Sequence, residues 1–138
     1  MVLVVDDREE TRFVLTRLLR LQGYDATAVG SGREALDFVH EKKPSLLILD
    51  YEMPELDGLA VFRQMKTRHE SRDIPVVMFS ASDGKVREEA LGEGVKAWVM
   101  KGSLDLAELL REVAIHVGPA QPPHAAETPA PPRTNLAG

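Results

Sequence analysis

Short apolar segments recur at regular intervals along the chain. Those at 2–5, 46–49 and 75–79 are apolar throughout, and 25–29 and 97–100 are weaker candidates of the same kind. Continuous apolar runs of four or five residues are typical of strands that are buried on both faces, as in a parallel sheet. The pattern therefore predicts five short strands.

Segments with helical spacing alternate with these strands. The first has apolar positions Phe13, Val14, Leu18 and Leu21 and is expected to stop at Gly23. Further helices are predicted between the remaining strands and after the last one. They are a helix opened by a capping box from Ser31 to Glu34 with Ala35, Leu36 and Val39 on one face, helices at 59–68 and 86–93, and one that begins at a second capping-box-like segment, 105–108.

A strand followed by a helix, five times over, predicts an α/β fold in which helices cover both faces of a parallel sheet. For five such units the flavodoxin-like (βα)5 arrangement is the natural choice, with strand order 2-1-3-4-5, although periodicity alone does not fix the order. We expect one folded unit at 1–117. The segment 118–138 holds six of the nine prolines and few large apolar residues, so we expect a disordered tail or linker.

Composition excludes several classes of function. The net charge of −5 argues against a nucleic-acid-binding surface, which usually has a basic excess. The absence of cysteine excludes disulfides and thiolate metal sites and fits a cytoplasmic protein. No apolar run approaches the roughly 20 residues that span a bilayer, so no membrane association is expected.

Polar residues stand where the predicted strands end. Asp6 and Asp7 follow the first strand, Asp50 ends the third, Ser80 ends the fourth and Lys101 follows the fifth. Ligands of open parallel sheets bind outside the carboxyl ends of the strands. We therefore expect these five side chains to converge on one pocket.

The chemistry of such a pocket favours phosphoryl transfer. Three crowded carboxylates repel one another and are stabilised by a divalent cation, and carboxylates without histidine or cysteine suit Mg²⁺. Lys101 adds a second positive centre for a dianionic phosphoryl group, and Ser80 adds a hydrogen-bond donor. An aspartate can itself be the nucleophile and form an acyl phosphate.

These residues resemble the receiver domain of bacterial two-component response regulators, over roughly 1–117. The resemblance rests on five motifs in order, which are Val4-Val5-Asp6-Asp7, Leu49-Asp50-Tyr51-Glu52-Met53-Pro54, Asp57-Gly58, Ser80-Ala81 and Lys101. It implies that Asp50 is the phosphoacceptor, charged by a histidine kinase or a phosphotransfer protein. It also implies that Asp7 and Asp50 bind Mg²⁺ by their side chains, Glu52 by its backbone carbonyl, and Asp6 directly or through a water.

The resemblance further implies a conformational switch. Ser80 matches the hydroxyl that moves toward the phosphoryl group, and Trp98 matches an aromatic residue that turns inward behind it. Downstream proteins would read the face formed by the fourth helix, the fifth strand and the fifth helix. Gly102 follows Lys101 where the family usually has proline, so we expect a trans peptide bond or a remodelled loop there.

Plainer interpretations and two other classes of function stay open. Asp6 and Asp7 can cap the first helix together with Glu10, Asp57 can belong to a turn, and Trp98 can be half-buried packing. The chain can be an interaction module that works without phosphorylation. It can also be a small aspartyl-phosphate phosphatase, although the chain has no room for a cap domain. We expect a phosphoacceptor that assists its own phosphorylation and slow dephosphorylation, and not an enzyme in the usual sense.

Overall fold

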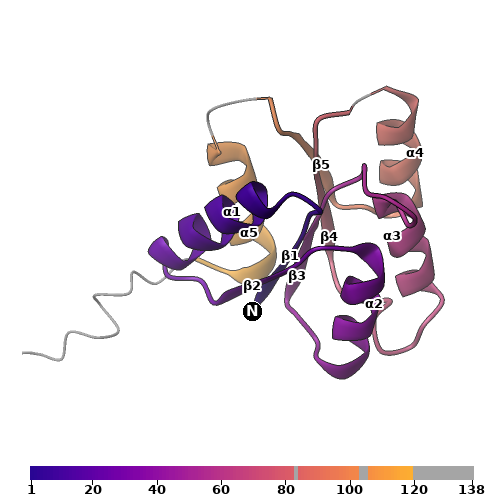
Figure 1. Cartoon of the computed structure of the whole chain (residues 1–138), viewed down its shortest axis with the longest axis horizontal. Coiled ribbons are helices and arrows are strands. Elements are labelled where there is room, and N and C mark those ends of the chain that lie inside the picture. The colour runs from indigo at the N-terminus through magenta and orange to yellow at the C-terminus, as the bar shows by residue number, and fades with distance from the viewer. Residues whose placement is uncertain (83, 103–105, 120–138) are drawn as a thin grey trace, which may run out of the picture.

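Five parallel strands form the central sheet of the computed structural model, in the order β2-β1-β3-β4-β5 (Figure 1). The structure describes residues 1–82, 84–102 and 106–119. The strands are β1 (Val2–Val5), β2 (Ala26–Val29), β3 (Leu46–Leu49), β4 (Val76–Ser80) and β5 (Ala97–Met100). This is the predicted flavodoxin-like order, so the predicted fold is confirmed.

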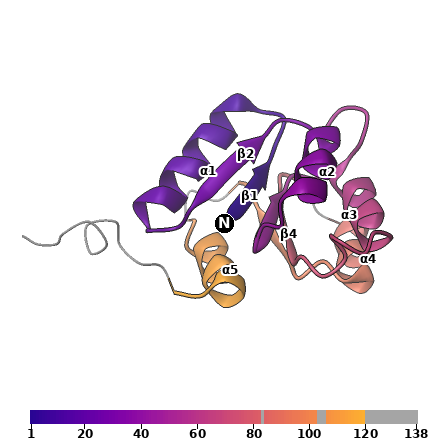
Figure 2. The ribbon, with the colours of Figure 1, turned by 90° about the horizontal axis from the view of Figure 1, so that it is seen from below.

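Helices cover both faces of the sheet, as Figure 2 shows from below. The helices are α1 (Glu9–Leu21), α2 (Gly32–Glu41), α3 (Gly58–Lys66), α4 (Lys85–Glu93) and α5 (Ala107–Val117). α1 and α5 pack on one face, and α2, α3 and α4 pack on the other. All connections are thus of the strand–helix–strand kind that parallel neighbours require.

The central strands are buried on both faces, which explains why their sequences are apolar throughout. Along β1, Leu3 and Val5 face the core under α2, α3 and α4, whereas Val2 and Val4 face the core under α1 and α5. All four side chains are at most 1% exposed. Because successive side chains of a strand point to opposite faces of the sheet, each strand contributes residues to two separate apolar cores.

α1 packs through a different face from the one that its apolar residues suggested. Leu15 and Leu19 are buried against the sheet, whereas Phe13, Val14 and Leu21 are 63%, 52% and 62% exposed. Apolar residues occur around much of this helix, so spacing alone did not determine its orientation. Packing against the sheet selected Leu15 and Leu19.

The other helices start close to where the sequence placed them. The Ser31 hydroxyl caps α2 by accepting a hydrogen bond from the Glu34 backbone N–H at 3.1 Å, which confirms the serine half of the first capping box. The Glu34 carboxylate accepts from the backbone N–H of Gly30, one residue before the cap, at 2.8 Å. α5 begins at Ala107, and Asp105 of the second predicted box lies outside the described residues. So does nearly all of the predicted tail, 120–138. In the described part of the chain no helix has the length and apolar character needed to cross a membrane.

Candidate functional site

The carboxyl ends of the strands bring the predicted polar residues together. Asp6 directly follows β1 and Asp50 directly follows β3, and the two strands pair in register up to Val5 and Leu49. The Asp50 backbone N–H donates to the Val5 carbonyl at 2.9 Å, which extends the ladder by one bond. Because backbone pairing fixes this register, the two carboxylates must lie side by side at the sheet edge.

Asp6, Asp7 and Asp50 form a cluster of carboxylates. One oxygen from each lies within 4.8 Å of the others. Asp6 is 2% exposed and Asp50 is 5% exposed, whereas Asp7 is open to solvent. A group of carboxylate oxygens that is open on one side fits Mg²⁺, which takes one or two carboxylates and keeps several waters. The residues present therefore fit the metal that the sequence predicted.

Lys101 reaches into this cluster from the end of β5. Its ammonium nitrogen lies 2.6 Å from Asp6 Oδ2 and 3.4 Å from Asp50 Oδ2, and its side chain is 17% exposed. The Lys101 backbone N–H donates to the Ser80 carbonyl at 2.8 Å, which places the residue just beyond the sheet. The described ranges contain no cis peptide bond, so the bond to Gly102 is trans, as expected.

The surroundings of Asp50 oppose its ionisation. Burial, followed by repulsion from Asp6, raises the pKa of Asp50 from its ordinary value of 3.8 to about 6. Lys101 and a hydrogen bond from the Glu52 backbone N–H act in the opposite direction and do not fully compensate. A further cation beside Asp50 would therefore stabilise the ionised carboxylate that nucleophilic attack requires.

The loop between β3 and α3 is built closely against Asp50. The Gly58 backbone N–H donates to the Tyr51 carbonyl at 2.8 Å. A Cβ at Gly58 would lie 2.4 Å from the Asp50 carbonyl oxygen, so only glycine fits. Asp57 caps α3 by accepting a hydrogen bond from the Ala60 backbone N–H at 2.9 Å. Asp57, predicted to belong to a turn, is thus the residue at which α3 starts. An aspartate just before an apolar segment is a common sequence signal for such a helix start.

A second set of contacts links Ser80 to Trp98. Ser80 is fully buried, and its Oγ accepts a hydrogen bond from the Ser82 backbone N–H at 3.1 Å. The indole Nε1 of Trp98 donates to the Ser82 carbonyl at 2.8 Å, and the Trp98 and Tyr51 ring centroids are 5.9 Å apart. Trp98 is 4% exposed, so it is buried rather than half-buried. A switching role for Trp98 stays a prediction.

The cluster opens into a cleft of about 210 Å³. The residues that line it are Asp7, Arg8, Asp50, Glu52, Ala81 and Lys101. The structure thus brings Asp6, Asp7, Asp50 and Lys101 together at the strand ends, whereas Ser80 and Trp98 are buried. The sequence interpretation missed Arg8, although its place directly after two aspartates was a usable signal.

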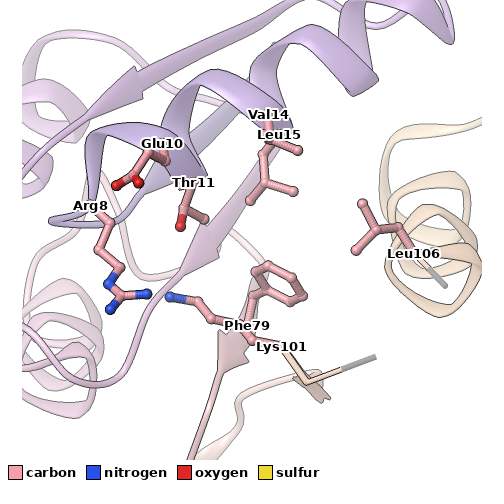
Figure 3. A pocket seen from close by; sticks show the side chains of 8 residues that line it. All are labelled: Arg8, Glu10, Thr11, Val14, Leu15, Phe79, Lys101 and Leu106. Carbon is pink, nitrogen blue, oxygen red and sulfur yellow. The ribbon is translucent and has the colours of Figure 1, made fainter. Parts of the chain in front are cut away.

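A second hollow, of about 290 Å³, lies between α1 and the start of α5 and adjoins the cleft (Figure 3). Its lining residues are Arg8, Glu10, Thr11, Val14, Leu15, Phe79, Lys101 and Leu106. Arg8 and Lys101 line both hollows. The cationic side chains of Arg8, at the start of α1, and Lys101, at the end of β5, therefore stand where the two hollows meet.

Comparison with known sequences gives a consistent result. The sequence model of the response regulator receiver domain matches residues 2–114. The polar-differentiation response regulator DivK of Brucella ovis is 31% identical over 120 residues, which are 86% of this chain and 97% of DivK. Response regulator MprA of Mycobacterium bovis is 35% identical over 92% of this chain and 54% of MprA. Two-component response regulator ORR7 of rice is 38% identical over 72% of this chain and 49% of ORR7. The chain thus spans about half the length of MprA and ORR7.

Solved structures of similar fold agree with the sequence comparison. Response regulator TrrA of Thermotoga maritima, solved in complex with Mg²⁺ and beryllofluoride, is 29% identical with a TM-score of 0.74, over 83% of this chain and 96% of TrrA. The receiver domain of sensor histidine kinase PA1611 from Pseudomonas aeruginosa was solved with Mg²⁺ in its active-site cleft. It is 25% identical with a TM-score of 0.76, over 85% of this chain and 96% of that domain.

Proposed function

Because the chain belongs to the response regulator receiver domain family, we propose that it is a phosphorelay switch whose Asp50 accepts a phosphoryl group. The donor is a histidine kinase or a phosphotransfer protein, and phosphorylation changes which protein the domain binds. One observation carries the proposal. The Asp50 carboxylate is 5% exposed, lies in a cleft with two other carboxylates, and has the Lys101 ammonium 3.4 Å from its Oδ2.

In this proposal the acidic residues, Lys101 and Ser80 have separate roles in the transfer. A carboxylate oxygen of Asp50 attacks phosphorus, and the leaving group departs on the opposite side with the bonding electrons. The side chains of Asp7 and Asp50 and the Glu52 backbone carbonyl would hold Mg²⁺, and Asp6 would do so directly or through a water. The ion would neutralise charge on the phosphoryl oxygens. Lys101 would move its ammonium from Asp6 toward the phosphoryl oxygens, and the Ser80 hydroxyl would donate to one of them.

The contacts that link Ser80 to Trp98 through Ser82 support the switching part of the proposal. Movement of Ser80 toward a phosphoryl group would break its bond from the Ser82 N–H, and the Ser82 carbonyl is also the acceptor of the Trp98 indole. Phosphorylation would thus bias a two-state equilibrium of the β4–α4 loop. The α4-β5-α5 face lies next to this loop and is the surface that we propose for the downstream partner. We place this exchange in the cytoplasm.

Labelling by a small phosphodonor tests the proposal. The full chain is incubated with acetyl phosphate and Mg²⁺, and intact mass is expected to show addition of one phosphoryl group. Asp50→Asn should abolish labelling, whereas the matched control Asp37→Asn, on the exposed face of α2, should label like the unmodified chain. EDTA should also prevent labelling.

The outcomes separate the proposal from its rivals. An unlabelled chain would favour an interaction module that works without phosphorylation. Undiminished labelling of Asp50→Asn would place the phosphoryl group elsewhere and refute the proposed role of Asp50. Repeated turnover of a generic phosphate ester would favour the phosphatase.

A further inference from the structure

Arg8 is a cation of the cleft that the proposed transfer does not yet use. It lies directly after Asp7 and is the N-cap residue of α1, so the start of that helix fixes its backbone. Its backbone N–H donates to Asp6 Oδ1 at 2.9 Å, which ties it to the carboxylate cluster. Its side chain lines the acidic cleft and the adjoining hollow, and Figure 3 shows it extending toward the Lys101 ammonium.

The Arg8 guanidinium differs from Lys101 in having no partner among the residues that the structure describes. Lys101 is held by Asp6 at 2.6 Å and Asp50 at 3.4 Å. The Arg8 side chain makes neither a hydrogen bond nor an ion pair with any residue of the described ranges 1–82, 84–102 and 106–119. Its side chain is exposed and therefore available to a molecule that enters from solvent.

The charge of the cleft explains what an unpaired cation there would do. The three carboxylates of the cluster and the Lys101 ammonium leave a negative charge that a divalent cation would only neutralise. Glu52, which also lines the cleft, adds a further negative charge. A phosphodonor arrives with further negative charge, so its approach is opposed unless another cation faces it. A guanidinium presents a planar fork of donors that matches two phosphoryl oxygens at once, which an ammonium does not.

We propose that Arg8 binds the phosphoryl oxygens of the incoming donor at the mouth of the cleft and so sets how well the domain uses small acyl phosphates. The inference rests on the proposed function and adds a phosphoryl-binding residue to it. With acetyl phosphate, the bond between phosphorus and the acetate oxygen breaks, the bond to an Asp50 carboxylate oxygen forms, and acetate leaves with the electron pair. Arg8 keeps its protons throughout and acts only by charge and hydrogen bonding.

Replacement of Arg8 is compatible with folding. Its side chain makes no capping bond to α1, and the bond to Asp6 comes from its backbone, which alanine retains. Arg17 provides a matched control because it lies on the helix that Arg8 precedes, is also exposed and lines a hollow away from the acidic cleft. Arg8→Ala and Arg17→Ala change the net charge by the same amount.

The test measures the second-order rate constant of phosphorylation by acetyl phosphate with saturating Mg²⁺, followed by intact mass. We expect Arg8→Ala to lower it about fivefold, the scale of one exposed ion pair, and Arg8→Lys to recover part of the loss. Arg17→Ala should leave it unchanged, and the difference between Arg8→Ala and the unmodified chain should shrink in high salt. Fluorine NMR gives a second measure, in which Arg8→Ala should raise the half-saturating beryllofluoride concentration by a similar factor.

Each outcome decides the matter. Equal rates for Arg8→Ala and the unmodified chain overturn the inference and leave the proposed function intact. Equal losses in Arg8→Ala and Arg17→Ala also overturn it, because they indicate a general effect of charge. If the unmodified chain neither becomes labelled nor binds beryllofluoride, the proposed function itself fails and the role of Arg8 fails with it.

Discussion

Replacing Gly58 with alanine is expected to destabilise the protein and disturb the acidic cleft together. Gly58 is the first residue of α3, where alanine would ordinarily be the better helix former. The added Cβ, however, would lie 2.4 Å from the Asp50 carbonyl oxygen and 2.9 Å from the Tyr51 Cα. Both are backbone atoms, so no side-chain rotation relieves the clash and the loop after β3 must move.

The expected size follows from these contacts. Inserting a methyl group into a well-packed place costs about 1–3 kcal/mol, and the helix gains back up to about 1 kcal/mol from losing glycine. We therefore expect a net loss of about 1–2 kcal/mol in the free energy of unfolding. Because the displaced backbone carries Asp50, the affinity for Mg²⁺ should also fall.

Gly92 provides the matched control for this experiment. It lies within α4, and no atom of the described residues stands within 4 Å of the Cβ that alanine would add there. Gly92→Ala should therefore stabilise the protein by about 0.5–1 kcal/mol. Urea denaturation gives both free energies, and titration calorimetry compares Mg²⁺ affinities. The same substitution should thus have opposite effects at the two positions.

A Gly58→Ala variant as stable as the unmodified chain, with unchanged Mg²⁺ affinity, would refute the reasoning. It would mean that the loop after Asp50 yields to the methyl group without cost. Loss of stability with intact Mg²⁺ affinity would refute only the link between this loop and the position of Asp50.

Three further predictions concern single side chains. Asp50 has a raised pKa, so its ionisation opposes folding above pH 6, and the opposition disappears as the pH falls toward 4. Asp50→Asn in EDTA should therefore be more stable by about 2 kcal/mol at pH 8 and nearly equal at pH 4 in urea titrations. Leu19→Ala should cost about 2–5 kcal/mol and Leu21→Ala under about 0.5 kcal/mol by thermal or urea unfolding, whereas similar losses would contradict the observed face of α1. Trp98→Phe removes the hydrogen bond to the Ser82 carbonyl, so we expect a loss of about 1–2 kcal/mol by the same assay, and no loss would show the bond to be dispensable.

Periodicity in the sequence predicted the helices well where the apolar residues formed a single stripe. In α2, Ala35, Leu36 and Val39 are buried as expected, and Ser31 caps the helix. In α1 apolar residues surround more of the helix, so several orientations satisfied the pattern. Only contact with the sheet selected Leu15 and Leu19, because the buried face depends on neighbours that are distant in sequence.

The acidic cluster shows the same division between sequence and tertiary structure. The sequence by itself determined that Asp6, Asp7, Asp50, Ser80 and Lys101 stand at strand ends, since a parallel sheet places all carboxyl ends on one edge. It did not determine that Arg8 turns toward the cleft, that Gly58 lies against the Asp50 carbonyl, or that the Trp98 indole reaches Ser82. Those contacts join segments that are distant in sequence, and they depend on the direction of each side chain and on the space that its neighbours leave. A local pattern of hydrophobic residues carries no information about side-chain direction or about that space.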